Sequence, residues 1–115
     1  MNPIELISAP ITRRHLKEIA EKRFGDMVKG VVDIEKEIMA LGGELHADEE
    51  AFLLESGSQQ RNLWGINLYP ELSLPDFLEY DSMINIRPSQ KNRSRGVEDP
   101  MIRQKIESIV GKLVP

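Results

Sequence analysis

The fold depends on the stretch TRRHLKEIAEKRFGDMVKGVVDIEKEIMALGG, residues 12–43. Within it, apolar side chains recur at steps of three or four residues from Leu16 to Leu41. This period places them on one side of an α-helix. We therefore expect residues 12–41 to be helical, with an apolar stripe that faces the core or a second copy of the chain.

Both ends of this segment carry helix signals. The hydroxyl of Thr12 can accept a hydrogen bond from the first turn of a helix. Gly42 and Gly43 tolerate the left-handed conformation in which helices often end. Gly25 lies between Thr12 and Gly42 and can divide the segment. The prediction is therefore one N-terminal helix or a helical hairpin.

Strand patterns lie on both sides of this segment. Residues 4–8 are a short apolar-rich stretch typical of an edge strand, and residues 51–54 are a short apolar run. Apolar and polar side chains then alternate over residues 64–69 and, most clearly, over residues 78–87. Such alternation indicates strands with one buried face and one open face.

A further helix is expected at the C-terminal end of the chain. Asp99 is a favoured N-cap residue, and Pro100 is favoured at the first helical position. Residues 100–114 then carry an apolar face. Together the elements predict an α+β fold. Its antiparallel sheet has three or four strands, with the N-terminal helix or hairpin and the C-terminal helix packed on one face.

The composition limits the class of protein. A chain of 115 residues is expected to form one domain, residues 1–115. The absence of cysteine excludes disulfides and thiolate chemistry and fits a cytoplasmic location. A net charge of -4 argues against general nucleic-acid binding. No apolar run is long enough to cross a membrane, and no cofactor motif is present, so we expect neither a membrane nor a cofactor.

The polar side of the two later strands is the first candidate site. Antiparallel sheets often leave one face open, and the side chains expected here have directional hydrogen-bonding groups. They are interpreted either as part of a ligand site or as a solvated surface. By alternation this side carries Asn67, Tyr69, Asp81, Asn85 and Arg87.

The second candidate is the loop within INIRPSQKNRSRGVEDP, residues 84–100. It holds four cations without an acid between Arg87 and Arg95. Arginine presents a planar fork that matches pairs of phosphate or carboxylate oxygens. We therefore assign Arg87, Arg93 and Arg95 to an anion site. The alternative is internal neutralisation of residues 44–55, which carry five acids and no lysine or arginine.

His46 lies in that acidic segment and raises two further alternatives. Together with the carboxylates of residues 48–50 it has a spacing that can ligate a divalent ion. One histidine among surface acids is common, however, and we assign no metal site. A small hydrolase or ribonuclease-like enzyme would use His46 and Asp81 as general base or metal ligands and Arg87 to stabilise developing negative charge.

The sequence thus favours a binding module for an anionic or phosphate-bearing small molecule, which uses the polar sheet face and the arginine-rich loop. The enzyme is the second hypothesis. A homodimer formed through the apolar stripe of residues 16–41 is the third. These hypotheses belong to different functional classes, and all three remain open at this point.

Three stretches resemble a family of small prokaryotic proteins: GGELHADEE, WGINLYP and DSMINIRPSQKNRSRGVEDP. The likeness extends from about Ile4 to Leu113. The family is one of uncharacterised single-domain proteins, so the resemblance implies no catalytic or binding residue. The element order is also similar to that of small ribonuclease toxins, although this chain is acidic and lacks their basic groove.

Overall fold

The computed structural model describes residues 4–115, which form an α+β fold. Within them, a five-stranded antiparallel sheet has the strand order β1-β3-β2-β4-β5. The predicted fold class is confirmed, although the sheet is larger than the three or four strands expected. The strands are β1 (Glu5–Ile7), β2 (Val28–Asp33), β3 (Ile38–Leu41), β4 (Leu63–Leu68) and β5 (Leu78–Glu79), and the helices are α1 (Arg13–Glu21), α2 (His46–Glu55) and α3 (Pro100–Leu113).

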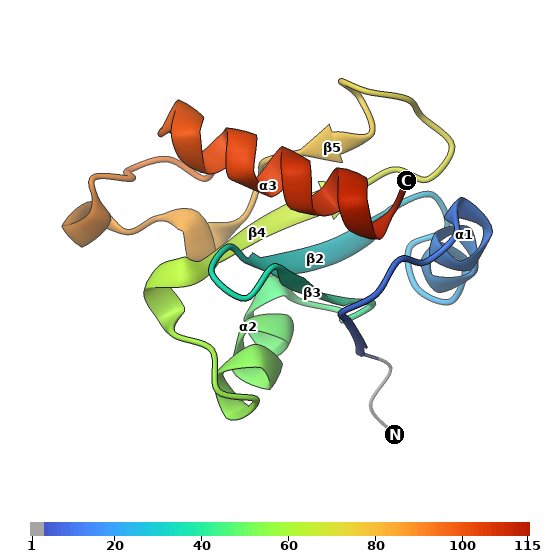
Figure 1. Ribbon diagram of the computed structural model, residues 1–115, viewed down its shortest axis with the longest axis horizontal. Coiled ribbons are helices and arrows are strands. Elements are labelled where there is room, and N and C mark those ends of the chain that lie inside the picture. The colour runs from blue at the N-terminus through green and yellow to red at the C-terminus, as the bar shows by residue number, and fades with distance from the viewer. Residues whose placement is uncertain (1–3) are drawn as a thin grey trace.

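Helices cover both faces of the sheet (Figure 1). On one face, α1 and α3 bury Leu16 and Ile106 against a cluster that includes Trp64 of β4. On the other face, Leu53 of α2 packs against Val31 of β2. The N-terminal helix α1 and the C-terminal helix α3 thus pack on one face, as predicted, whereas α2, which was not predicted, covers the other face. None of the helices in residues 4–115 is both long and apolar enough to span a bilayer.

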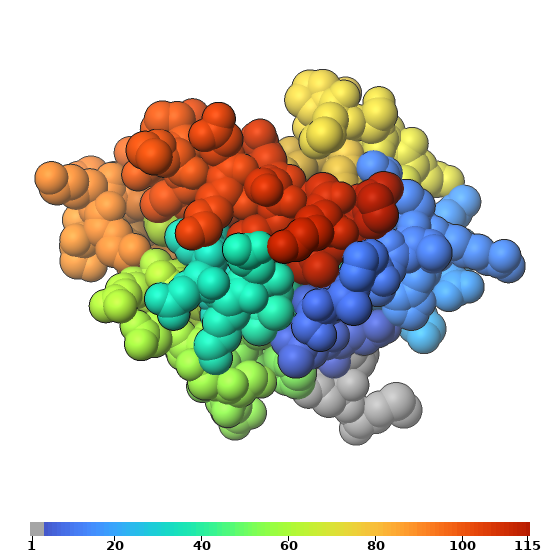
Figure 2. Space-filling view, in the orientation of Figure 1, coloured from blue at the N-terminus to red at the C-terminus, as the bar shows by residue number. Residues whose placement is uncertain are grey.

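The two ends of the described chain meet beside the sheet. Figure 2 shows the C-terminal end of α3 against the segment that precedes α1. There the Ile11 N–H donates to the carbonyl oxygen of Leu113 at 2.8 Å.

The N-caps predicted for the first and last helices are confirmed. Thr12 caps α1 by accepting from the His15 N–H at 3.0 Å, and Asp99 caps α3 by accepting from the Met101 N–H at 2.9 Å.

The prediction of a helix over residues 12–41 is wrong after Glu21. Gly25 has φ +90°, a conformation that glycine adopts readily and other residues do not, and α1 has ended before it. The chain then forms the β2–β3 hairpin, in which Gly30 pairs with Leu41 and Asp33 pairs with Ile38. The apolar stripe on which the homodimer hypothesis rested is therefore not present.

The helical period arose because β2 is buried on both faces. Val28 and Val32 point into the core under α1 and α3, whereas Val31 points toward α2. Apolar residues consequently occur on both sides of the strand, and their spacing imitates a helix. Asp33 then starts the hairpin turn, because its Oδ1 accepts from the N–H groups of Glu35 and Lys36 at 2.9 and 3.0 Å.

Helix α2 was not predicted, because its buried side is largely polar. Its buried residues are His46, Glu49 and Leu53, spaced as on one side of a helix. Two of the three carry ionisable side chains, so the apolar pattern showed only a short run over residues 51–54. A helix whose buried positions are polar cannot be predicted from the spacing of its hydrophobic residues.

The strand predicted over residues 78–87 ends at Glu79, and a 3-10 helix (Met83–Asn85) follows. Ser82 caps this turn by accepting from the Ile84 N–H at 3.3 Å. The Asn85 side chain, which is fully buried, then bonds to both main-chain groups of Gly65 in β4. A side-chain amide thus takes the place of a neighbouring strand, which alternation of residue types cannot reveal.

Candidate functional site

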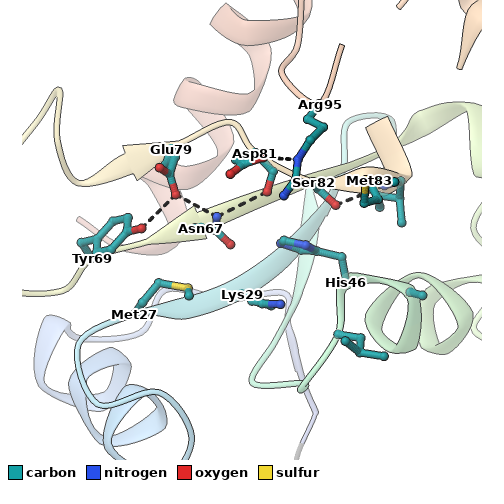
Figure 3. A pocket seen from close by; sticks show the side chains of 13 residues that line it. Met27, Lys29, His46, Asn67, Tyr69, Glu79, Asp81, Ser82, Met83 and Arg95 are labelled. Carbon is teal, nitrogen blue, oxygen red and sulfur yellow. Dashed lines mark hydrogen bonds and ion pairs between the residues drawn. The ribbon is translucent and has the colours of Figure 1, made fainter. Parts of the chain in front are cut away.

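A cleft of about 490 Å³ lies on the α2 side of the sheet, between the start of α2 and the segment that follows β5. It is formed by strands β2, β4 and β5, by the first turn of α2, and by residues of the loop before α3. Figure 3 shows the side chains that surround it. They are Met27, Lys29, Leu45, His46, Ala47, Asn67, Tyr69, Glu79, Asp81, Ser82, Met83, Ile84 and Arg95.

Three polar residues cross the floor of this cleft in one row. Lys29 of β2 is paired with Asn67 of β4, and Asn67 is paired with Glu79 of β5. Side chains directly opposite each other in a ladder project from the same face and lie side by side. The register therefore sets a cation, an amide and an anion next to one another. We call Lys29, Asn67 and Glu79 the polar row.

Asn67 is held in one orientation at the centre of the polar row. Its Nδ2 donates to Glu79 Oε1 at 2.9 Å and to the Asp81 carbonyl oxygen at 3.4 Å. Its Oδ1 is buried and accepts no hydrogen bond within residues 4–115, although a protonated His46 would donate to Asn67, an interaction that raises the pKa of His46. In Figure 3 this oxygen points into the cleft, away from Glu79 and on the side of Lys29 and His46. The cleft therefore contains an acceptor that the protein leaves open.

Glu79 lies at the outer end of the polar row. Its Oε1 also accepts from the Tyr69 hydroxyl, at 2.8 Å. Burial, followed by the hydrogen bond to Glu79, raises the pKa of Tyr69 to about 12, so the phenol keeps its proton. The donors that reach Glu79 are neutral groups. Within the described residues its carboxylate thus has no cationic partner.

Arg95 is the residue of the basic loop that reaches the cleft. Its Nε donates to Asp81 Oδ1 at 2.6 Å, and both side chains are about half exposed. The Arg95 carbonyl oxygen accepts from the Ser82 N–H at 2.9 Å and from Asn85 Nδ2 at 3.0 Å. These main-chain bonds anchor Arg95 beside Asp81 at the cleft, and no hydrogen bond of its two terminal guanidinium nitrogens is found within residues 4–115.

His46 is the first residue of α2 and forms part of the cleft wall. Its Nε2 lies 2.8 Å from the Ile66 carbonyl oxygen, which can only accept. Nε2 therefore carries the proton, and Nδ1 is an acceptor in the neutral ring. Burial lowers the pKa of His46, and the charge of Lys29 lowers it further. The imidazole is therefore neutral at physiological pH.

Glu49 lies one turn further along α2 and is fully buried. Its Oε2 accepts from the Gly43 N–H at 2.9 Å, while its Oε1 has no partner within residues 4–115. Burial raises the pKa of Glu49 to about 9, and the nearby charge of Lys29 only partly opposes this rise. Glu49 is therefore a neutral carboxylic acid at pH 7, and it leaves the Lys29 charge uncompensated.

The predicted site residues divide into two groups. The structure brings Asn67, Tyr69, Asp81 and Arg95 together in the cleft, and adds His46, which was considered for the enzyme. The other three predicted residues, Asn85, Arg87 and Arg93, are not among the residues that line it.

Arg87 and Asn85 make internal contacts instead. The Arg87 guanidinium stacks 4.2 Å from the centre of the Trp64 ring and donates to the carbonyl oxygens of Leu63 and Gln60. Burial lowers the pKa of Arg87, and the charge of Glu50 opposes this effect. The Asn85 amide is occupied with Gly65, as described above. In this structure these two side chains therefore hold the loop against β4.

The basic loop is organised by its own residues. Asn92 is buried and donates to the carbonyl oxygens of Asn85 and Gly96 at 2.7 and 2.8 Å. Glu98 accepts from the N–H groups of Arg93 and Ser94, while the Arg93 side chain is exposed. No ion pair within residues 4–115 joins this loop to residues 44–55. The charge of Glu50 nevertheless acts on Arg87, so internal neutralisation of residues 44–55 by the loop stays a prediction.

The structure also separates the carboxylates that were considered with His46. Glu49 is turned inward to the Gly43 N–H, and the imidazole is turned to the Ile66 carbonyl oxygen. No group of three or more His, Asp or Glu side chains within residues 4–115 is arranged to hold a metal ion.

Sequence reasoning missed Lys29 and Glu79. Lys29 was not considered as a site residue because residues 12–41 were interpreted as a helix. On the surface of such a helix, a lysine is expected to be solvated. The signal that could have revealed it is the segment VKGVVD, which is rich in β-branched residues and fits a strand. Glu79 lies in the alternating segment of residues 78–87, but its partner on the neighbouring strand could not be chosen without the register.

The fold and cleft define an α+β sheet domain with a polar cleft of small-molecule size. The chain belongs to the family DUF5674, described as a protein of unknown function, whose family model matches residues 5–113. The resemblance noted from the sequence is thereby confirmed. A search of curated proteins and a search of solved structures each found no match.

Proposed function

We propose that this protein binds a small anionic molecule, a carboxylate or a phosphate-bearing compound, in the cleft beside α2. The observation that carries the proposal is the state of Lys29. Its side chain lines the cleft, and its described side-chain contact is with the Phe24 ring, whose centre lies 5.3 Å from the ammonium. The charge of Lys29 acts on His46 and Glu49, and burial disfavours the charged form of both, because it lowers the pKa of His46 and raises that of Glu49 to about 9.

An uncompensated lysine in a concave site is well suited to an anion. The ammonium is a point charge with three donors and attracts phosphate or carboxylate oxygens. Walls of low polarity strengthen this attraction, because they exclude water from the charge. The apolar side chains of Leu45 and Ile84 supply such walls on two sides.

Arg95 supports the same ligand from the opposite wall. Within residues 4–115 only its Nε has a partner, Asp81 Oδ1, so the terminal nitrogens can donate to a second anion. The arginine-rich loop therefore contributes one residue to the proposed site, rather than the three that the sequence suggested. Asn67 and Tyr69 shape the floor between the two cations.

The test is thermal denaturation of the purified protein with phosphate, pyrophosphate and short carboxylates, at matched ionic strength set with chloride. A ligand of the folded state raises the melting temperature in proportion to the logarithm of its concentration once it exceeds the Kd. We expect Lys29→Met to abolish this shift. Arg93→Met is the matched control, because Arg93 is an exposed cation outside the cleft.

Two outcomes would overturn parts of this proposal. Equal shifts in the wild type and in Lys29→Met would place the anion elsewhere. Loss of the shift in Arg93→Met but not in Lys29→Met would make the tip of the loop the site, as the sequence suggested.

A second candidate function is an enzyme, and the neutral His46 favours it. An imidazole whose Nδ1 is free of a proton at neutral pH can act as a general base. Asp81 lies in the same cleft, but Arg87 does not, so the developing charge would have to be stabilised by Arg95. The test is turnover of phosphate esters and short RNA. Loss of turnover in His46→Gln with retained ligand binding would establish the enzyme, whereas equal turnover would exclude this role for His46.

A further inference from the structure

The polar row carries opposite charges at its two ends. Lys29 forms no ion pair within residues 4–115, and Glu79 receives only neutral donors, from Asn67 and Tyr69. The Asp81 charge, by contrast, is compensated by Arg95 at 2.6 Å. The cleft therefore presents one uncompensated cation and one uncompensated anion, with Asn67 between them.

The centre of the row needs a donor. Asn67 is 6% exposed, and its Oδ1 has no partner within residues 4–115. The amide cannot rotate to exchange its two ends, because its Nδ2 is engaged by Glu79 and by the Asp81 carbonyl oxygen. A buried acceptor of this kind is normally satisfied by a hydrogen-bond donor.

A simple anion does not meet this need. Phosphate and carboxylate groups at neutral pH bring mainly acceptors, which suit Lys29 but oppose Asn67 Oδ1 and the Glu79 carboxylate. A ligand that satisfies the whole row has a cationic donor at one end and an anion at the other. Side chains at the two ends of the row arise from backbones two strand spacings apart, about 10 Å, and both are long enough to close on a short ligand.

We propose that the ligand of this cleft is a zwitterion of the α-amino acid class with an apolar side chain, whose ammonium meets Asn67 Oδ1 and Glu79 while its carboxylate meets Lys29. This inference rests on the proposed function, because it names the class of molecule that brings a carboxylate to Lys29. The apolar side chain is assigned to the rim, where Leu45 and Met83 are 52% and 65% exposed. An apolar group covering them removes that surface from water.

The experiment compares three matched probes on the folded wild-type protein by isothermal titration calorimetry at pH 7. L-Leucine carries both charges, 4-methylpentanoate lacks the amine, and 3-methylbutylamine lacks the carboxylate. We expect L-leucine to bind at least tenfold more tightly than either analogue, because only it engages both ends of the polar row.

Variants assign the two ends. Glu79→Gln keeps an oxygen that accepts from Asn67 and Tyr69 but removes the charge, so we expect tenfold weaker binding of L-leucine and unchanged binding of 4-methylpentanoate. Lys29→Met is expected to weaken both carboxylates. Glu71→Gln is the matched control, because Glu71 is an exposed acid paired with Lys17 outside the cleft.

The outcomes separate this inference from the proposed function. If 4-methylpentanoate binds as tightly as L-leucine, or phosphate binds and no amino acid does, the ligand is a simple anion and the zwitterion is overturned while the proposed function stands. If neither simple anions nor zwitterions bind, both proposals fail.

Discussion

The side-chain amide of Asn85 bonds to both main-chain groups of Gly65. Its Oδ1 accepts from the Gly65 N–H at 2.8 Å, and its Nδ2 donates to the Gly65 carbonyl oxygen at 3.0 Å. These are the bonds that a residue of an adjacent strand would make. One side chain thus completes the hydrogen bonding of β4 beyond the end of β5, and positions the segment that forms one wall of the cleft.

Removal of this amide should destabilise the fold strongly. Asn85→Ala leaves the buried N–H and carbonyl of Gly65 unpaired, and we expect a loss of about 3 kcal/mol in the free energy of unfolding. Urea denaturation measures it. Asn62→Ala is the matched control, because its side chain makes no described hydrogen bond, and it should change stability by less than about 0.5 kcal/mol. Similar losses in both variants would contradict the role of Asn85.

The close approach of the segment after β5 to strand β4 also requires a residue without a side chain at Gly65. A Cβ at this position would lie 2.5 Å from both Ser82 Cβ and Ser82 Oγ. We expect Gly65→Ala to lower the free energy of unfolding by about 1–3 kcal/mol, and a second change, Ser82→Gly, to recover part of that loss. Gly111→Ala is the control, because no atom of residues 4–115 lies within 4 Å of a Cβ there and the residue is in α3. It should stabilise the protein by up to about 1 kcal/mol.

Glu49 should make stability fall as the pH rises. Its pKa is about 9 in the folded protein against 4.5 in the unfolded chain, so the folded state keeps a proton that the unfolded state releases between these values. The free energy of unfolding then decreases by up to about 1.4 kcal/mol per pH unit across that window. The destabilising effect of Glu49 is absent below pH 4.5 and is largest above pH 9.

Glu49→Gln removes this dependence, because the amide imitates the neutral acid. We expect the variant to have a flatter profile than the wild type and to be the more stable protein at pH 8. Urea denaturation from pH 5 to pH 8 measures both slopes. Glu55→Gln, an exposed position on the same helix, should leave the slope unchanged. Parallel profiles for wild type and Glu49→Gln would show that Glu49 is ionised when folded.

Arg87 distinguishes a structural role from the ligand role that the sequence suggested. Lysine keeps the charge but cannot stack on Trp64 while donating to Leu63 and Gln60. We expect Arg87→Lys to cost about 1–2 kcal/mol in the free energy of unfolding, with anion binding unchanged. If stability is retained and binding is lost, Arg87 belongs to the ligand site after all.

The segment from Arg13 to Leu41 shows where sequence reasoning is limited. Its first third is an amphipathic helix with Thr12 as its cap, and both features follow from local residue types. The remainder includes the β2–β3 hairpin. Strand β2 is buried on both faces of the sheet, so its valines do not alternate with polar residues. Helix α2 was not predicted because two of its three buried side chains, His46 and Glu49, are ionisable.

The candidate site was predicted only in part. Alternation in β4 indicated Asn67 and Tyr69, and the loop sequence indicated Arg95 among several cations. Lys29 and Glu79 were missed because their place beside Asn67 depends on strand pairing. A shift of one residue in that pairing would have turned Lys29 toward the opposite face.

Local residue patterns were sufficient to predict the fold class, the N-caps of α1 and α3, and the strand at β4, because caps and alternation act between neighbours in the chain. The number of strands, the placement of α2 and the polar row became known from the three-dimensional fold alone. These depend on contacts between segments far apart in sequence, such as Lys29 with Asn67 and Asn85 with Gly65. Such contacts are selected by packing and hydrogen bonding of the whole fold, and local residue patterns do not encode them.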